Sequence, residues 1–294
     1  MASVAVVTGA NSGIGRATAI HLAAHGYDVY GTVRSRERAA KLGAMSAERG
    51  VEVRLVDLDV ADDDSVRRGF DEILGRAGHV DVLVNNAGVG GNGVVEETDP
   101  ARYLEAMNVN VCGAVRGIQA VLSGMRERRR GAIVNISSVA GRIAALAQSP
   151  YVASKWALEG LSEELAQELA PFGIRVVIVE PGITRSAIFP KNTDAPNRTG
   201  AYDDHYRRMF QMYAAGLEQP TDPFEVAEVV RHAVTTDRPR LRYRTSWGAE
   251  ELIGGRERMS DDDWISLGSR GSDDDAYYSR FHELFGLDIR PADP

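Results

Sequence analysis

Cysteine and lysine are scarce in this chain of 294 residues, and it contains no long apolar run. Because Cys112 is the single cysteine, an internal disulfide is excluded, which fits a reducing compartment and predicts a cytoplasmic location. The net charge of −8 and the pI of about 5.4 argue against nucleic acid as a partner, since no excess of cations is available to replace counterions on phosphates. No apolar stretch is long enough to span a membrane, and the first residues show no charged leader or cleavage pattern.

Motifs of two common hydrolase classes are also missing. No Gly-x-Ser-x-Gly sequence occurs, so no serine has the strained turn of a serine hydrolase. His21 and His25 are four residues apart but lack the acid of a metalloprotease motif, and the six histidines form no ligand cluster. The sequence therefore predicts no metal site.

Short apolar segments alternate with helical patterns along the whole chain. With 44% hydrophobic residues, the chain can bury a full core, and no linker divides it, so we expect a single domain over residues 1–294. The alternation is typical of an α/β protein with a doubly wound, mostly parallel sheet and helices on both faces. Strands are predicted at Ser3–Thr8, Val29–Val33, Val51–Asp57, Val82–Val84, Ala132–Ser137 and Arg175–Val179.

A glycine-rich turn follows the first predicted strand and opens a helix from about Ile14 to His25. Glycines allow a sharp turn and a close approach of the backbone, while a helix N-terminus offers free N–H groups to an anion. The spacing Gly-x-x-x-Gly-x-Gly is typical of a dinucleotide site that binds a pyrophosphate, although other glycine-rich strand-to-helix turns would look similar. The candidate residues are Gly9, Asn11, Ser12, Gly13, Ile14 and Gly15.

Tyr151 and Lys155 lie four residues apart, so on a helix they share a face. A free tyrosine, with a pKa of about 10, is a poor base at neutral pH. A neighbouring ammonium favours the phenolate, so the pair is a candidate general acid and base.

Together these motifs resemble the short-chain dehydrogenase/reductase family over nearly the whole chain. The resemblance rests on Thr8–Gly15, Asp59-Val60, Asn85–Gly88, Asn110, Ile136–Ser138, Tyr151-x-x-x-Lys155 and Pro181-Gly182, in the family's order. It implies a Rossmann fold and an oxidoreductase in which Tyr151 is the acid/base and Ser138 polarises the substrate oxygen. It also implies that Lys155 holds the nicotinamide ribose and lowers the pKa of Tyr151, while Asn110 anchors a proton-relaying water.

The end of the second predicted strand bears on cofactor choice. Val33 occupies the place where an NAD-selective site has a carboxylate, and Arg34 follows with a guanidinium suited to a phosphate. We therefore expect NADP(H) to be preferred, with NAD(H) possible; alternatively Arg34 is only an exposed strand end. Ser12 stands where many NADP-selective relatives have a second basic residue. The resemblance further assigns cofactor contacts to Asp59, Asn86, Gly182 and Ile183, besides Tyr151 and Lys155.

The family has a variable lid after Pro181-Gly182, here from about Ser186 to Gln219. Aromatic and apolar residues in it share one helical face, which either packs on the core or lines a substrate pocket. We expect a bulky, largely apolar alcohol or ketone, contacted by Ser138, Tyr151, Tyr206, Phe210 and Tyr213. The face also includes Tyr202 and Met209.

Within the family the chain is similar to the 17β-hydroxysteroid dehydrogenase-type subgroup, including an extension over about residues 250–294. The motifs are Val29–Arg34, Ala153–Gly160, Glu225–Glu228, Leu241–Tyr243 and Glu283–Gly286. The steroid enzyme's lid histidine is absent from Phe210–Ala215, so steroids, retinoids, polyketide-type ketones and long-chain alcohols all stay open. The resemblance also implies a homo-oligomer, a dimer or a tetramer, and the composition suggests a bacterial source.

Two alternatives use the same fold. A cofactor-sensing binding protein would normally have lost the tyrosine or the lysine, and both are retained here. A dehydratase or epimerase would usually carry a larger substrate domain. The acidic clusters at 261–263 and 273–275 are predicted to begin helices, since acidic residues suit a helix N-terminus.

Overall fold

The computed structural model describes residues 2–185, 195–269 and 273–291. Its centre is a seven-stranded sheet in which every neighbouring pair is parallel, in the order β3-β2-β1-β4-β5-β6-β7. The five inner strands are almost completely buried, as expected for a parallel sheet covered on both faces, whereas the edge strands β3 and β7 are partly exposed. The strands are β1 Val4–Val7, β2 Asp28–Val33, β3 Arg54–Asp57, β4 Val82–Asn85, β5 Gly131–Ile136, β6 Ile174–Pro181 and β7 Arg242–Thr245.

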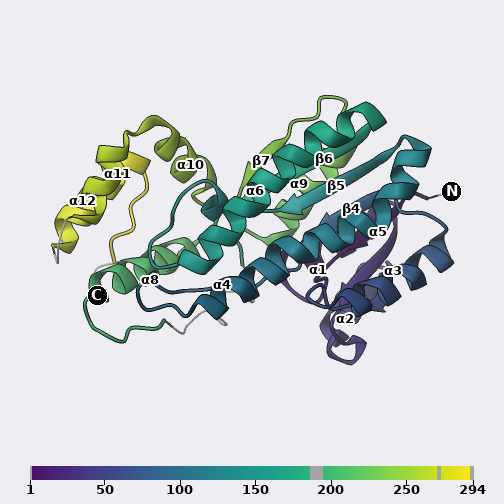
Figure 1. Cartoon of the computed structure of the whole chain (residues 1–294), viewed down its shortest axis with the longest axis horizontal. Helices are drawn as coiled ribbons and strands as arrows, with labels where there is room; N and C mark the ends of the chain where they lie inside the picture. The colour runs from purple at the N-terminus through teal and green to yellow at the C-terminus, as the bar shows by residue number, and fades with distance from the viewer. Residues whose placement is uncertain (1, 186–194, 270–272, 292–294) are drawn as a thin grey trace.

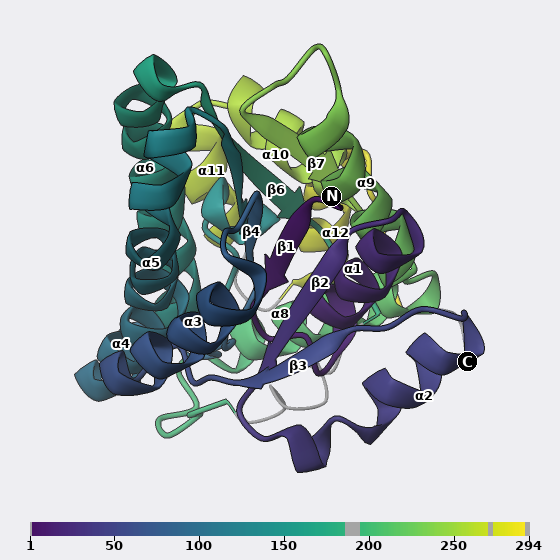
Figure 2. The same cartoon turned by 90° about the vertical axis from the view of Figure 1, so that its right-hand side faces the viewer.

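Helices cover the two faces of the sheet and form two apolar cores with it (Figure 2). On one face lie α1 (Gly13–Ala24), α2 (Ala40–Glu48) and α9 (Pro223–Thr235). On the other lie α3 (Asp63–Ala77), α5 (Gly113–Arg128) and α6 (Ser149–Leu169). Helix α4 (Pro100–Met107) leads into α5 through a π-helical turn at Asn108–Cys112.

The C-terminal part of the chain gathers at one end of the molecule, beyond the carboxyl ends of the strands (Figure 1). It consists of α8 (Asp203–Glu218), α10 (Ala249–Arg258), α11 (Asp261–Gly268) and α12 (Asp274–Phe285). These helices share a third apolar core with Val139 and Ile143, which follow β5. The extension therefore packs against the segment that carries Ser138.

The predicted fold class is confirmed, and every predicted strand is present with shifted ends. The strand expected from Val51 begins at Arg54, and β7 was not predicted as a strand. Both acidic clusters begin helices as predicted, with caps from Ser260 to the Asp263 N–H and from Asp273 to the Ala276 N–H. In the described parts of the chain, no helix has the length and apolarity that crossing a bilayer requires.

Candidate active site

The turn between β1 and α1 leaves no room for side chains at two of its glycines. Gly9 has a φ of +67°, and a Cβ there would lie 2.8 Å from the Ala87 Cα. A Cβ on Gly15 would lie 2.2 Å from Asn86 Nδ2. The side chain of Ser12, the residue before α1, makes no capping hydrogen bond to the helix. A bare backbone and an uncapped helix N-terminus fit the pyrophosphate of a dinucleotide.

Side-chain hydrogen bonds hold the ends of neighbouring strands around this turn. Asn86 Nδ2 donates to the carbonyls of Thr8 and Gly9 at 2.9 and 3.3 Å. Thr8 Oγ1 accepts from the backbone N–H groups of Asn86 and Ala87, each at 3.0 Å. After β3, Asp59 Oδ1 accepts from the Ala61 N–H at 3.0 Å. The loops after β1 and β4 are thus tied to each other, and the loop after β3 is held by its own hydrogen bond. All three lie at the carboxyl ends of the strands, the usual place for ligands in an open α/β sheet.

A cleft of about 930 Å³ runs along this edge. It brings together ten of the residues predicted to bind the cofactor besides Tyr151 and Lys155, whereas Gly15 lies behind it against Asn86. The ten are Gly9, Asn11, Ser12, Gly13, Ile14, Arg34, Asp59, Asn86, Gly182 and Ile183.

Two arginines after β2 line the cleft. Arg34 and Arg38 are exposed, and neither has an ion-pair partner among the described residues. Arg36, between them, is instead bound by Asp57 at 3.1 Å and by Glu72 at 2.9 Å. Sequence reasoning missed Arg38, because only the short turn at Arg36–Arg38 brings it back to the cleft. Glu37 lines the same region, so its charge partly offsets the two guanidinium groups.

Tyr151 and Lys155 lie one turn apart near the start of α6 and both line the cleft. Lys155 Nζ donates to the Ile136 carbonyl at 2.8 Å and lies 5.6 Å from the centroid of the Tyr151 ring. Burial lowers the pKa of Lys155 to about 8, while the Glu159 carboxylate acts in the opposite direction. The ammonium group is therefore fixed beside the phenol, with donors left over for a ligand in the cleft.

Ser138 lies two residues after the end of β5, at the start of the turn Val139–Gly141, and faces Tyr151. Its Oγ accepts the Ala140 N–H at 3.1 Å, which leaves the hydroxyl proton free to point elsewhere. Burial raises the pKa of Tyr151, and a hydrogen bond with the Ser138 hydroxyl lowers it in part. The family resemblance implies that Lys155 lowers this pKa, but in the polypeptide alone burial raises it, and the effect that opposes burial comes from Ser138.

Asn110 is buried in the π-helical turn and connects two parts of the site. It accepts from the Val89 N–H at 2.8 Å and donates to the Val89 carbonyl at 3.0 Å. It also donates to Ser154 Oγ at 2.9 Å, and Ser154 donates to the Tyr151 carbonyl at 2.8 Å. Asn110 does not line the cleft, so the structure places it behind Tyr151 rather than beside Lys155.

The three aromatic residues predicted to contact substrate lie in different surroundings. Tyr213 lines the cleft and donates to Asn92 Oδ1 at 3.2 Å; burial and the nearby Tyr151 raise its pKa. Tyr206 lies outside the cleft, on the buried face of α8, and donates to Glu97 at 3.0 Å. Phe210 is 37% exposed and also lies outside it. Met212, which sequence reasoning missed, lines the cleft next to Tyr213.

A second, largely apolar cavity of about 240 Å³ adjoins this end of the cleft. Ile143, Ala145 and Met212 line both spaces. The remaining walls come from α8 and the C-terminal helices, including Met209, Leu252, Leu267, Tyr277, Phe281 and Phe285. The predicted lid residues 186–194, including Ser186, lie outside the described residues.

One group of possible metal ligands lies elsewhere, between α1 and α9. The ligand atoms of His21, His25 and Glu228 are within 4.8 Å of one another. Glu228 is already held by Arg231 at 2.5 Å and by His21 at 2.8 Å. Hydrogen bonds from Arg231 are the main reason that the pKa of Glu228 falls to about 2. The group therefore forms an ion-pair cluster that joins the two helices.

Comparison with known proteins agrees with this geometry. The family model for short chain dehydrogenase matches residues 3–197. The chain is 35% identical to 17-beta-hydroxysteroid dehydrogenase type 1 of Homo sapiens over 257 residues, 83% of this chain and 77% of that protein. It is similar to the structure of a short-chain dehydrogenase from Streptomyces avermitilis, with a TM-score of 0.78 and 38% identity. The match covers 92% of this chain and 98% of that one. The chain is also similar to the structure of a variant of actinorhodin polyketide ketoreductase with NADPH, with a TM-score of 0.73 and 31% identity. That match covers 83% of this chain and 95% of the ketoreductase chain. The chain belongs to the short-chain dehydrogenase family and is an oxidoreductase that acts on CH–OH groups.

Proposed function

We propose that this enzyme interconverts a secondary alcohol and a ketone on a bulky, largely apolar substrate, with NADP(H) as the preferred cofactor. The observation that carries the proposal is one continuous cleft. At one end lie the bare glycine turn and Arg34, in the middle Ser138, Tyr151 and Lys155, and at the other end Met212 and the apolar cavity. The first region suits a dinucleotide, the second suits the reacting oxygen of the substrate, and the third suits an apolar part of the substrate.

The reacting oxygen is served by two hydroxyl groups. Tyr151 holds the proton that a ketone oxygen takes up on reduction, and it removes that proton in the oxidation direction. Ser138 accepts the Ala140 N–H with one lone pair and donates its own proton to the same substrate oxygen, which stabilises the developing alkoxide. Lys155 keeps two N–H donors beyond its bond to Ile136, and these suit the hydroxyls of a ribose.

The cofactor would supply the hydride or accept it, and the residues of the cleft fit NADP(H). Gly9 and Gly13 present bare backbone to the cleft, where a pyrophosphate can approach, and Gly15 lets the start of α1 pack against Asn86. Arg34 and Arg38 present guanidinium groups without ion-pair partners among the described residues, and Ser12 lines the same cleft. A guanidinium group binds a phosphate through paired hydrogen bonds, so this region suits the 2′-phosphate of NADP(H).

Two features favour a bulky apolar substrate. Beyond Tyr151 the walls are formed by Ile143, Met212 and Tyr213, and the neighbouring cavity is lined chiefly by apolar and aromatic groups. Relatives named for a steroid and for a polyketide are similar over most of the chain. We infer a substrate of this general size, with its reacting oxygen at Ser138 and its apolar arm toward α8.

The test is consumption of NADPH, and separately of NADH, with steroidal, retinoid, aromatic polyketide-type and long-chain aliphatic ketones. We expect turnover of at least one large apolar ketone and a higher kcat/KM with NADPH than with NADH. Equal or better turnover with NADH would contradict the cofactor assignment. NADPH binding, measured by fluorescence, without turnover of any ketone would favour the alternative, a cofactor-sensing protein.

A further inference from the structure

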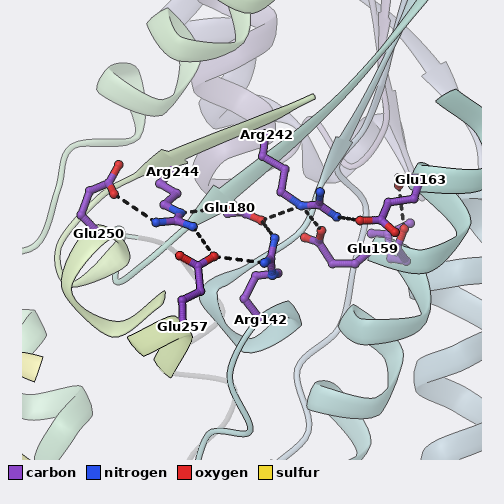
Figure 3. A network of polar contacts seen from close by, with 10 residues as sticks. Arg142, Glu159, Glu163, Glu180, Arg242, Arg244, Glu250 and Glu257 are labelled. Carbon is purple, nitrogen blue, oxygen red and sulfur yellow. Dashed lines mark hydrogen bonds and ion pairs between the residues drawn. The ribbon is translucent and has the colours of Figure 1, made fainter. Parts of the chain in front are cut away.

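A carboxylate with no exposed surface lies immediately behind the catalytic residues. Glu180, near the end of β6, faces three arginines from two other segments (Figure 3). Its oxygens lie 3.4 Å from Arg142 Nη1, 3.2 Å from Arg242 Nε and 3.7 Å from Arg244 Nε. The reaction as described above makes no use of this group.

A second buried carboxylate joins the same network from α6. Glu159 Oε2 accepts from Arg242 Nε at 3.0 Å, so one guanidinium group bridges Glu159 and Glu180. Arg242 also binds Glu163, at 2.6 Å. From α10, Glu257 binds Arg142 at 3.1 Å and Arg244 at 2.6 Å, and the more exposed Glu250 lies 3.4 Å from Arg244. Helices α6 and α10 are thereby tied to β6 and β7.

Each inner member of this network adjoins a segment that lines the cleft. Arg142 directly follows the turn Val139–Gly141, which Ser138 caps. Glu159 lies one helical turn beyond Lys155. Glu180 directly precedes Pro181-Gly182, whose backbone lines the cleft. The network therefore fixes the serine, the lysine and the cofactor-facing turn relative to one another.

Burying the carboxylates of Glu159 and Glu180 disfavours their charged forms. Burial and the neighbouring Glu159 raise the pKa of Glu180 to about 7, although Arg142, Arg242 and Arg244 lower it. One oxygen of Glu159 and one of Glu180 receive no hydrogen bond among the described residues. Apolar side chains of similar shape often stabilise a core as well as buried ion pairs do. Stability alone therefore gives no reason for charged groups at this place.

We propose that Glu180 is a positioning residue for the reaction, which fixes the Ser138 turn through Arg142 and the Lys155 turn of α6 through Arg242 and Glu159. The inference rests on the proposed function, since it concerns the same catalytic residues. Glu180 touches neither the cleft nor a reacting atom, and its effect passes through these ion pairs.

The test compares Glu180→Gln with the wild type in ketone reduction between pH 6 and 8. A tyrosine general acid by itself does not lose activity as pH falls, because it stays protonated. If the ionised form of Glu180 positions the catalytic residues, the kcat of the wild type should instead fall as the pH drops through about 7, because Glu180 is then protonated. Glu180→Gln should show a kcat at least tenfold lower at pH 8, no such fall at lower pH, and an NADPH dissociation constant within about twofold of the wild type.

Two further variants separate positioning from a general loss of stability. Arg142→Gln removes one charge that lowers the pKa of Glu180, so the fall in kcat should move to higher pH. Glu250→Gln, at the exposed rim, should keep the wild-type profile. A wild-type profile in Glu180→Gln, or a lower kcat with an unchanged pH dependence, would overturn the positioning role alone. A wild type that binds NADPH but reduces no ketone would remove the proposed function and the positioning role with it.

Discussion

At the scale of single residues, the proposed chemistry depends on the phenol of Tyr151, whose pKa burial raises. A tyrosine with a raised pKa stays protonated at neutral pH, so it is better suited to act as a general acid in reduction than as a general base in oxidation. Tyr151→Phe removes the proton but keeps the ring that packs near Lys155. We expect kcat to fall about 10²- to 10⁴-fold with NADPH binding retained. Tyr27→Phe is the matched control, because Tyr27 lies at the amino end of β2, is half-buried and does not line the cleft. Substantial turnover by Tyr151→Phe would contradict the assigned role.

Arg34 and Arg36 allow a controlled test of cofactor choice. Both are arginines after β2, but Arg34 lines the cleft while Arg36 is held by Asp57 and Glu72. Arg34→Asp should reverse the preference toward NADH, because a carboxylate repels a 2′-phosphate and accepts from a ribose hydroxyl. Arg36→Gln should leave the ratio of the two kcat/KM values unchanged. An unchanged ratio in Arg34→Asp would show that Arg34 does not read the phosphate.

At the scale of elements, one carboxylate in the loop after β4 holds the chain that leads into α8, the helix of the predicted lid. Glu97 accepts from the backbone N–H groups of Arg198 and Thr199 at 3.1 and 2.9 Å, and from Thr199 Oγ1 at 2.7 Å. Its other oxygen accepts from Tyr206 at 3.0 Å. Burial tends to raise the pKa of Glu97, but these hydrogen bonds together lower it. The ionised group therefore fastens the lid throughout the neutral range.

Glu97→Gln tests this fastening, because an amide offers one acceptor oxygen where the carboxylate offers two. We expect KM for large ketones to rise about 3- to 10-fold, as the loss of one or two hydrogen bonds would produce. The dissociation constant of NADPH should not change. Glu96→Gln is the matched control, since Glu96 is exposed and binds only Tyr202 among the described residues. Equal KM values for Glu97→Gln and the wild type would show that the lid is held by its apolar contacts.

The sequence predicted the elements whose pattern is local and missed those that tertiary contacts decide. Most strands before β7 are apolar runs, although β3 is Arg-Leu-Val-Asp. The glycine turn and the Tyr151–Lys155 spacing need only one strand end or one helix turn. Strand β7, with the sequence Arg-Tyr-Arg-Thr, lacks such a run and exists because it pairs with β6 and its arginines meet Glu180. Helical spacing likewise placed Tyr206, Phe210 and Tyr213 on one face, but it could not tell which of them the loop after β4 would cover.

At the scale of the whole molecule, the first part of the chain forms the cleft edge and the C-terminal helices form the apolar cavity beside it. The first six strands and their helices form the edge that fits a dinucleotide and carry Ser138, Tyr151 and Lys155. Helices α8 and α10–α12 add the apolar cavity beside that edge. Cofactor choice and substrate size should therefore be separable by mutation, with Arg34 governing the first and the C-terminal wall governing the second.

Met212 lies where the cleft meets this cavity, so it offers the sharpest test of that division. Met212→Trp places a larger ring at the passage, and it should lower kcat/KM for steroid-sized ketones at least tenfold while changing that for a small cyclic ketone by no more than about threefold. Met212→Leu, of similar volume, should preserve both values. Leu217→Trp, on an exposed position of the same helix, controls for the added ring. Equal losses for large and small ketones in Met212→Trp would mean that the apolar arm lies elsewhere, because blocking the cavity can discriminate only between substrates that do and do not enter it.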